Sequence, residues 1–105
     1  MDKIYLVTFR SRLREGNQEE YAAIATRMSE LVRTVPGFIA YKSFSAADGE
    51  RVTIAEFASE NAVKAWRDHP EHREAQQLGR KKFYESSRVQ VSVVERDYGL
   101  NLERL

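Results

Sequence analysis

The sequence has no cysteine. This absence excludes disulfides, thiolate metal sites, iron–sulfur clusters and cysteine nucleophiles. Because disulfides belong to oxidising compartments, we expect a cytoplasmic protein.

An excess of charge of either sign is also lacking. Lys and Arg total 17 against 16 for Asp and Glu, and the signs alternate along the chain. A nucleic acid or an anionic membrane would need a basic patch, so we expect neither as a partner. No apolar run reaches transmembrane length, and the acid at position 2 and the short apolar run in MDKIYLVTFR predict that there is no signal peptide.

The chain is long enough for one hydrophobic core. It has 105 residues, of which 42% are apolar, so we expect a single globular domain over residues 1–105. The last eight residues, YGLNLERL at 98–105, read as a tail that either crosses to a partner subunit or frays.

Periodicity predicts four strands and two helical elements. Alternating apolar residues indicate strands over 3–10, 38–45, 51–57 and 88–96, with Asp48-Gly49 as the hairpin turn of the middle pair. Helical spacing indicates a first helix, capped by Asn17, that ends before Pro36. We expect Ser59 to cap a second helix, a break at His69-Pro70, and a further helical segment to about Phe83.

The order β-α-β-β-α-β is typical of the ferredoxin-like α+β fold, an antiparallel four-stranded sheet with its helices on one face. Several of the predicted strands carry apolar residues on both faces, whereas the helices can cover only one. Since two-fold homodimers are the commonest oligomers, we expect a second copy to cover the other face.

Several motifs follow one another in an order that is similar to the antibiotic biosynthesis monooxygenase (ABM) family. They are PGF at 36–38, the hairpin into VTIAEF, the AVKAW helix, the HPEH break, and GRKKFYE before the last strand. The resemblance implies a dimeric α/β barrel with one pocket per subunit, between the helices and the sheet. It also implies oxygenase chemistry on aromatic polyketides or quinols without metal or organic cofactor, or, in another branch, haem degradation.

The haem branch carries an Asn on the first strand, a Trp on the second helical element and a His about ten residues past that Trp. Trp66 matches the second of these. The first strand has no Asn, and Gln76 stands where the His would be. Gln is a poor substitute for an axial imidazole, so we expect no haem. The resemblance to the oxygenases of the family implies that there is no other cofactor and that dioxygen is the co-substrate.

His72 is the main candidate for catalysis. On a helix it falls near the middle of an apolar arc that includes Ala75 and Phe83, so its imidazole is expected to point at the sheet. It is either a buried His bonded to a backbone carbonyl or hydroxyl, or a base or donor for a phenolic substrate. His69 reads as a cap or surface residue. No carboxylate stands at a spacing that would complete a metal site with the two His residues.

Three further side chains are candidates for the same site, each with a structural alternative. Trp66 is a core anchor or a wall against which an aromatic substrate stacks. Arg80 orients a substrate oxyanion or is solvated, and Tyr84 donates to the substrate or bridges core and water. The expected pocket aromatics are Phe38, Phe44 and Phe83, with strict alternation placing Phe38 and Phe44 on one face of their strand and Tyr41 on the other.

Together these observations predict a monooxygenase that oxidises a small aromatic, anthrone- or quinol-like substrate with dioxygen. The same apolar pocket would serve a small-ligand-binding or stress-response dimer without turnover. In either case the partner is a small hydrophobic or aromatic molecule.

Overall fold

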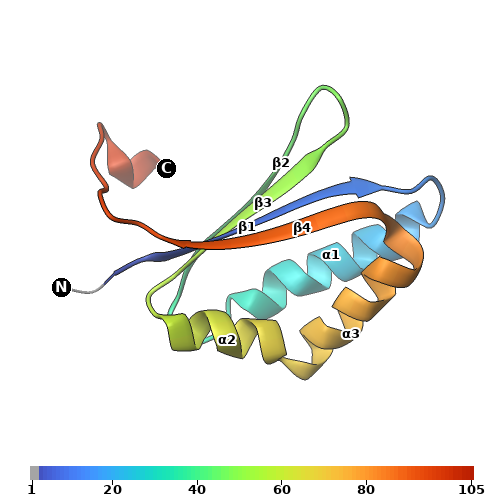
Figure 1. Ribbon diagram of the computed structural model, residues 1–105, viewed down its shortest axis with the longest axis horizontal. Helices are drawn as coiled ribbons and strands as arrows, with labels where there is room; N and C mark the ends of the chain where they lie inside the picture. The colour runs from blue at the N-terminus through green and yellow to red at the C-terminus, as the bar shows by residue number, and fades with distance from the viewer. Residues whose placement is uncertain (1–2) are drawn as a thin grey trace.

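The computed structural model describes residues 3–105, so residues 1 and 2 of the expected domain lie outside the described part. It contains a four-stranded antiparallel sheet of order β2-β3-β1-β4 with three helices on one face (Figure 1). The elements are β1 Tyr5–Leu13, α1 Gln18–Val32, β2 Phe38–Ser45, β3 Arg51–Phe57, α2 Glu60–Asp68, α3 Pro70–Leu78, a π-helical turn η1 Gly79–Phe83, β4 Tyr84–Val93 and a 3-10 turn η2 Leu102–Arg104. This confirms the ferredoxin-like α+β fold.

The element boundaries follow local signals, with one exception at a helix start. Ser59 caps α2, its Oγ accepting from the backbone N–H of Ala62 at 3.0 Å, and Pro70 opens α3. Asn17 stands at the N-cap position of α1, as predicted, but its side chain does not cap the helix. Asn17 has φ 56° and makes no side-chain cap bond, because it takes the left-handed conformation that Asn tolerates at the end of the β1–α1 loop.

The core lies between the helices and one face of the sheet. Its buried members come from α1, the loop after it, β3 and α2: Met28, Leu31, Val32, Val35, Ala55, Phe57, Ala62 and Trp66. Tyr5 and Val7 of β1 pack against this cluster. The odd-numbered residues of β1 therefore face the helices, and the register of the neighbouring strands follows from them.

A β-bulge in β2 changes which of its side chains face the helices. Phe38 pairs with Phe57 and Tyr41 pairs with Ala55, so Ile39 is an extra residue between them. The bulge places Phe38 and Tyr41 together on the helix-facing side and Phe44 on the open face. The predicted grouping of Phe38 with Phe44, opposite Tyr41, was therefore wrong, because strict alternation does not hold across a bulge.

A second bulge does the same for β4. Leu13 pairs with Tyr84, while Arg12 pairs with Ser86, which leaves Glu85 as the extra residue. If the strand alternated regularly through Glu85, Tyr84 would lie on the open face together with Ser86, because residues two apart share a face. Both bulges thus turn a tyrosine towards the helices.

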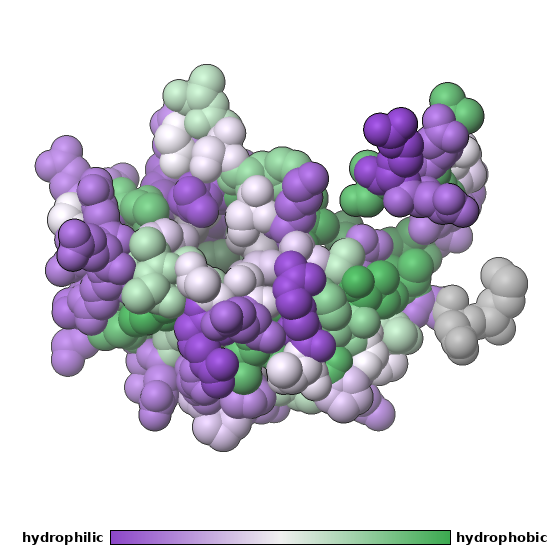
Figure 2. Space-filling model, turned by 180° about the vertical axis from the view of Figure 1, so that it is seen from behind, coloured by the Kyte–Doolittle hydropathy of each residue, from purple (hydrophilic) through white to green (hydrophobic). Residues whose placement is uncertain are grey.

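The opposite face of the sheet is covered by none of α1, α2 and α3, and only the tail with η2 lies on that side (Figure 1). Phe44 is 46% exposed there. The β2–β3 hairpin and the C-terminal tail project on either side of a hollow, and apolar surface lies between them (Figure 2). Within residues 3–105 no helix is long and apolar enough to cross a membrane.

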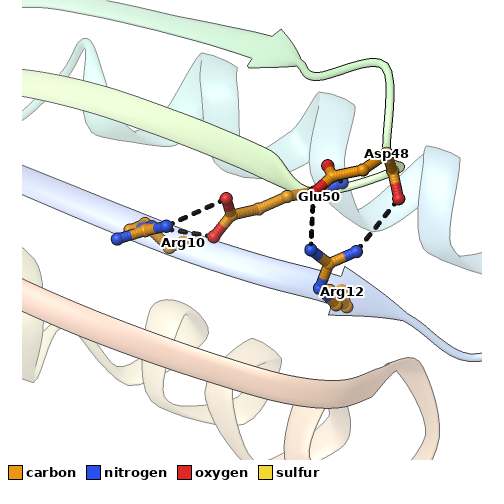
Figure 3. Close-up of polar contacts among 4 residues, drawn as sticks. All are labelled: Arg10, Arg12, Asp48 and Glu50. Carbon is orange, nitrogen blue, oxygen red and sulfur yellow. Dashed lines mark hydrogen bonds and ion pairs between the residues drawn. The ribbon is translucent and has the colours of Figure 1, made fainter.

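Two arginines of β1 tie the hairpin to the open face (Figure 3). Arg10 Nε donates to Glu50 at 2.7 Å, and Arg12 Nη2 donates to Asp48 at 2.9 Å. All four side chains are at least partly exposed, so the pairs add little stability. They do leave this end of the open face close to neutral.

Candidate functional site

The bend between α2 and α3 brings Trp66 and His72 into face-to-face contact. Their ring centroids are 3.8 Å apart and the planes differ by 13°. Trp66 is 7% exposed and belongs to the core, while His72 is half-buried. The bend is set by His69 and Pro70: His69 Nδ1 accepts from the N–H of Glu71 at 3.2 Å, and Pro70 is the first residue of α3. His69 is therefore a cap, as expected.

The protonation of His72 follows from its hydrogen bond. Nδ1 lies 2.7 Å from the carbonyl oxygen of Trp66. A carbonyl can only accept, so Nδ1 carries the proton and Nε2 has the lone pair. Burial lowers the pKa of His72, more than the bond to Trp66 raises it. The imidazole is consequently neutral at neutral pH, with Nε2 able to accept a proton.

We expected the imidazole of His72 to point at the sheet, whereas it lies against Trp66 of α2. The bond to a backbone carbonyl matches the structural alternative considered for this residue. Gln76, one turn further on, donates from its side-chain amide to the carbonyl of Arg67 at 3.3 Å, and the same nitrogen lies 3.3 Å from His72 Nδ1. Gln76 thus closes the α2–α3 bend, at the position where the haem branch carries a His, and a side-chain amide is a poor axial ligand.

A second group of polar side chains lies at the opposite end of the helix-facing side. It consists of Tyr21 from α1, Tyr41 from β2, Tyr84 from β4 and Arg51 from β3, and we call it the tyrosine–arginine cluster. The rings of Tyr21 and Tyr84 meet edge to face at 6.2 Å, and the guanidinium carbon of Arg51 lies 5.8 Å from the centre of the Tyr21 ring.

Burial keeps two of these phenols protonated. It raises the pKa of Tyr84 strongly, with smaller contributions from Tyr21 and Tyr41, and it raises the pKa of Tyr41 as well. Both hydroxyls therefore keep their protons across the working pH range. In the described part of the chain, no buried side-chain N or O atom lacks a partner.

The space beside the cluster is small and partly apolar. A cavity of about 90 Å³ is lined by Leu13, Arg14, Gly16, Gln18, Tyr21 and Phe83. Further along the same side of the sheet the helices leave β4 uncovered. Val89, Val91 and Val93 pair with Phe9, Val7 and Tyr5, yet they are 61%, 54% and 38% exposed. This valine strip is open apolar surface next to the helix layer.

The structure brings some of the predicted site residues together and separates others. Trp66 stacks on His72, and Phe83 and Tyr84 both meet the ring of Tyr21. The other three are not part of either group: Phe38 packs on Phe57 in the core, Phe44 lies on the open face, and Arg80 is exposed on η1.

Sequence reasoning missed Tyr21, Tyr41 and Arg51 as members of a polar group. Tyr21 was placed only among the apolar residues of the first helix, and strict alternation put Tyr41 on the wrong side. Arg51 opens a strand right after the hairpin, where a charged residue is ordinary. The sequence does contain the three tyrosines, but that they share one face of the sheet follows only from the two bulges.

Among residues 3–105, no three His, Asp or Glu side chains come together in a way that would hold a metal ion.

Comparison with known proteins adds a family to this geometry. The model of the family "Antibiotic biosynthesis monooxygenase" matches residues 4–78. The chain is 38% identical over 92 residues to the uncharacterized protein YqjZ of Bacillus subtilis strain 168, an alignment that covers 88% of this chain and 80% of that protein.

Two solved structures share the fold. One is SnoaB, a cofactor-independent oxygenase from Streptomyces nogalater, with a TM-score of 0.73, 16% identity, and coverage of 92% of this chain and 97% of that one. The other is a dimeric ferredoxin-like protein of unknown function from Thermobifida fusca, with a TM-score of 0.72, 16% identity, and coverage of 90% and 93%.

Proposed function

Since the chain belongs to the antibiotic biosynthesis monooxygenase family, we propose that it is a cofactor-independent monooxygenase that oxidises a small aromatic, anthrone- or quinol-like substrate with dioxygen. The substrate lies between the helices and the sheet, along the valine strip. The similarity to SnoaB, which its description calls a cofactor-independent oxygenase, supports this choice of chemistry.

The observation that carries the proposal is the state of His72. Its Nδ1–H donates to the carbonyl of Trp66 at 2.7 Å, and burial lowers its pKa. A base needs a neutral imidazole with a fixed orientation; burial favours the neutral form, and the hydrogen bond to Trp66 fixes the orientation. Trp66, stacked on the imidazole, limits the directions from which a substrate can approach Nε2.

The reaction needs only a base and a water-poor surface. With an anthrone-like substrate, His72 Nε2 removes one of the two protons of the reacting carbon, and the resulting anion transfers one electron to dioxygen. The substrate radical and superoxide combine into a peroxide anion, which takes up the proton from the imidazolium and becomes a hydroperoxide. Loss of the second hydrogen of that carbon breaks the O–O bond, so that one oxygen atom becomes the carbonyl of the product and the other leaves as water. The protein stabilises the anion and excludes water.

Oxygen uptake tests the proposal. Wild type is measured with a panel of anthrones and quinols beside His72→Ala and His69→Asn, the latter keeping a hydrogen-bond acceptor at the α3 cap. His72→Ala removes the base and should lower kcat by about 10²- to 10⁴-fold. His69→Asn should keep most of the wild-type kcat. Uptake by wild type that does not exceed uptake by His72→Ala would overturn the proposal.

A binding protein without turnover is the second candidate. It is favoured by the structural roles of the two residues: Trp66 belongs to the core, and His72 makes a hydrogen bond to the backbone carbonyl of Trp66. Tight binding of an aromatic ligand without oxygen uptake would select this function. A haem titration without a Soret shift would remove a haem protein from consideration, in agreement with Gln76.

We also propose that the protein is a homodimer joined through the open face of the sheet. Phe44 is exposed on this face, and the apolar surface between the hairpin and the tail needs a cover (Figure 2). The ion pairs of Arg10 and Arg12 neutralise the charge of these two arginines at one end of the face. The tail at 98–105 stands away from its own sheet (Figure 1) and would reach the partner subunit. The cytoplasmic location stays a prediction.

A further inference from the structure

The tyrosine–arginine cluster offers more hydrogen-bond donors than acceptors. Arg51 contributes a guanidinium, which can only donate. Tyr41 and Tyr84 stay protonated, so each contributes an O–H, and Tyr21 adds a third phenol within range of Tyr84. A group of donors with one positive charge is complementary to an oxygen that bears a negative charge.

Among the residues that the structure describes, Arg51 lacks the carboxylate partner that four other arginines of the chain have. Arg10, Arg12, Arg27 and Arg67 each hold a carboxylate through hydrogen bonds. Within residues 3–105, no carboxylate lies at ion-pair distance from Arg51. Its Nη1 donates instead to the neutral hydroxyl of Ser45 at 3.2 Å. A half-buried guanidinium that faces neutral groups gains when an anion binds beside it.

The surroundings of the cluster are aromatic. The ring of Tyr84 meets Phe9 edge to face at 5.3 Å, and the ring of Tyr21 meets Phe83 in the same way at 5.5 Å. The cavity of about 90 Å³ beside Tyr21 has the volume of about three water molecules, which suits a small polar group. Aromatic edges around a cationic, donor-rich centre fit a flat ring with an anionic substituent.

We propose that the tyrosine–arginine cluster binds the anionic oxygen group, a carboxylate or a phenolate, of an aromatic ligand. Arg51 provides the charge, and Tyr21 and Tyr84 provide the hydroxyl donors. The idea rests on the proposed function and deepens it, because it names the group by which a substrate is recognised at the end of the helix-facing side away from His72. Binding at the cluster does not require turnover, so the two can be tested apart.

The test is isothermal titration of the full-length chain in oxygen-free buffer. Benzoate carries the carboxylate, and benzamide has nearly the same shape without the charge. A parallel arm uses 4-nitrophenol above and below its own pKa, which separates recognition of a phenolate from recognition of a carboxylate. We expect benzoate or 4-nitrophenolate to bind at least about tenfold more tightly than its neutral counterpart, as a hydrogen-bonded charge provides.

Variants assign the effect to named side chains. Arg51→Gln should weaken binding of the anion at least about tenfold and leave benzamide unchanged. Arg51→Lys should bind the anion with an affinity between those of wild type and Arg51→Gln, because an ammonium keeps the charge but cannot donate two parallel hydrogen bonds as a guanidinium does. Tyr84→Phe and Tyr21→Phe should each weaken binding about threefold. Arg73→Gln is the matched control, since Arg73 is exposed on α3 and its loss removes the same charge.

Equal binding of the anion and its neutral counterpart, binding of neither, or equal loss in Arg51→Gln and Arg73→Gln would overturn the inference. Should Arg51→Gln fail to fold, Arg51→Lys and Tyr84→Phe carry the test. Oxygen uptake with an uncharged anthrone reports separately on the proposed function. Uptake that persists while anion binding fails rejects only the cluster, and the reverse rejects only the oxygenase.

Discussion

The ring of Tyr84 lies directly against the backbone of Gly79. A Cβ on residue 79 would come within 2.5 Å of Cε2 and 2.8 Å of Cδ2 of that ring. Gly79 has φ −59°, which any residue can adopt, so the need for glycine here comes from space and not from backbone conformation. Close approach of the tyrosine ring to the helical turn is what fixes the identity of residue 79.

We therefore expect Gly79→Ala to destabilise the protein by about 1–3 kcal/mol, because the ring of Tyr84 must move. In a Tyr84→Ala background the same change should stabilise by up to about 1 kcal/mol, since alanine favours a helix and the clash is gone. Urea unfolding of the four proteins of this cycle measures both values. The same sign in both backgrounds would show that the contact does not govern residue 79.

The lowered pKa of His72 makes stability depend on pH. Burial places the folded-state pKa of His72 below its usual 6.5, so the unfolded chain binds a proton more readily. The free energy of unfolding should decrease as pH falls below 6.5 and level off below the folded-state pKa. His72→Gln should decrease less over the same range. Unfolding by urea from about pH 8 to pH 5 tests this, and equal slopes for the two proteins would contradict it.

The Ser59 cap should have a measurable effect on α2. Ser59→Ala removes the acceptor for the N–H of Ala62, and we expect it to lower the free energy of unfolding by about 1 kcal/mol. Ser59→Asp, which keeps an acceptor at the cap, should restore most of that loss. Thermal unfolding followed by circular dichroism measures both, and an Ala variant as stable as the Asp variant would refute the assignment.

The proposed dimer depends on the open face. Phe44→Asp places a carboxylate on this face in each subunit, and we expect the dissociation constant of the dimer to rise at least about tenfold through desolvation and repulsion of the two charges. Ala23→Asp, on the exposed side of α1, is the matched control and should leave the dimer intact. Light scattering after size exclusion gives the mass. A wild-type monomer would contradict the dimer itself.

The elements of the fold could be predicted because their signals are local. β2 and β3 have the predicted bounds, and the turn at Asp48-Gly49, the caps at Ser59 and His69 and the break at Pro70 come from short-range stereochemistry. These features depend on a few neighbouring residues, which a single sequence contains in full.

The site was less predictable because it depends on register. The helical wheel found that His72 is partly buried, but it could not show that the α2–α3 bend turns the imidazole onto Trp66. Alternation in β2 failed at Ile39, since a bulge is specified by pairing with another strand and not by the strand itself. Tyr21 and Arg51 come together only after both strands and α1 have been placed.

The two bulges also bear on how the chain can change in evolution. Ile39 and Glu85 are the residues that have no partner on the neighbouring strand, so deleting either one would restore regular pairing and leave Tyr41 and Tyr84 on their present faces. A relative that is shorter by one residue at either point could therefore keep both tyrosines beside Arg51 without a bulge. A relative that keeps the residue but pairs it regularly would instead turn the tyrosine to the open face, so an alignment that shows both tyrosines does not by itself show that they share this site.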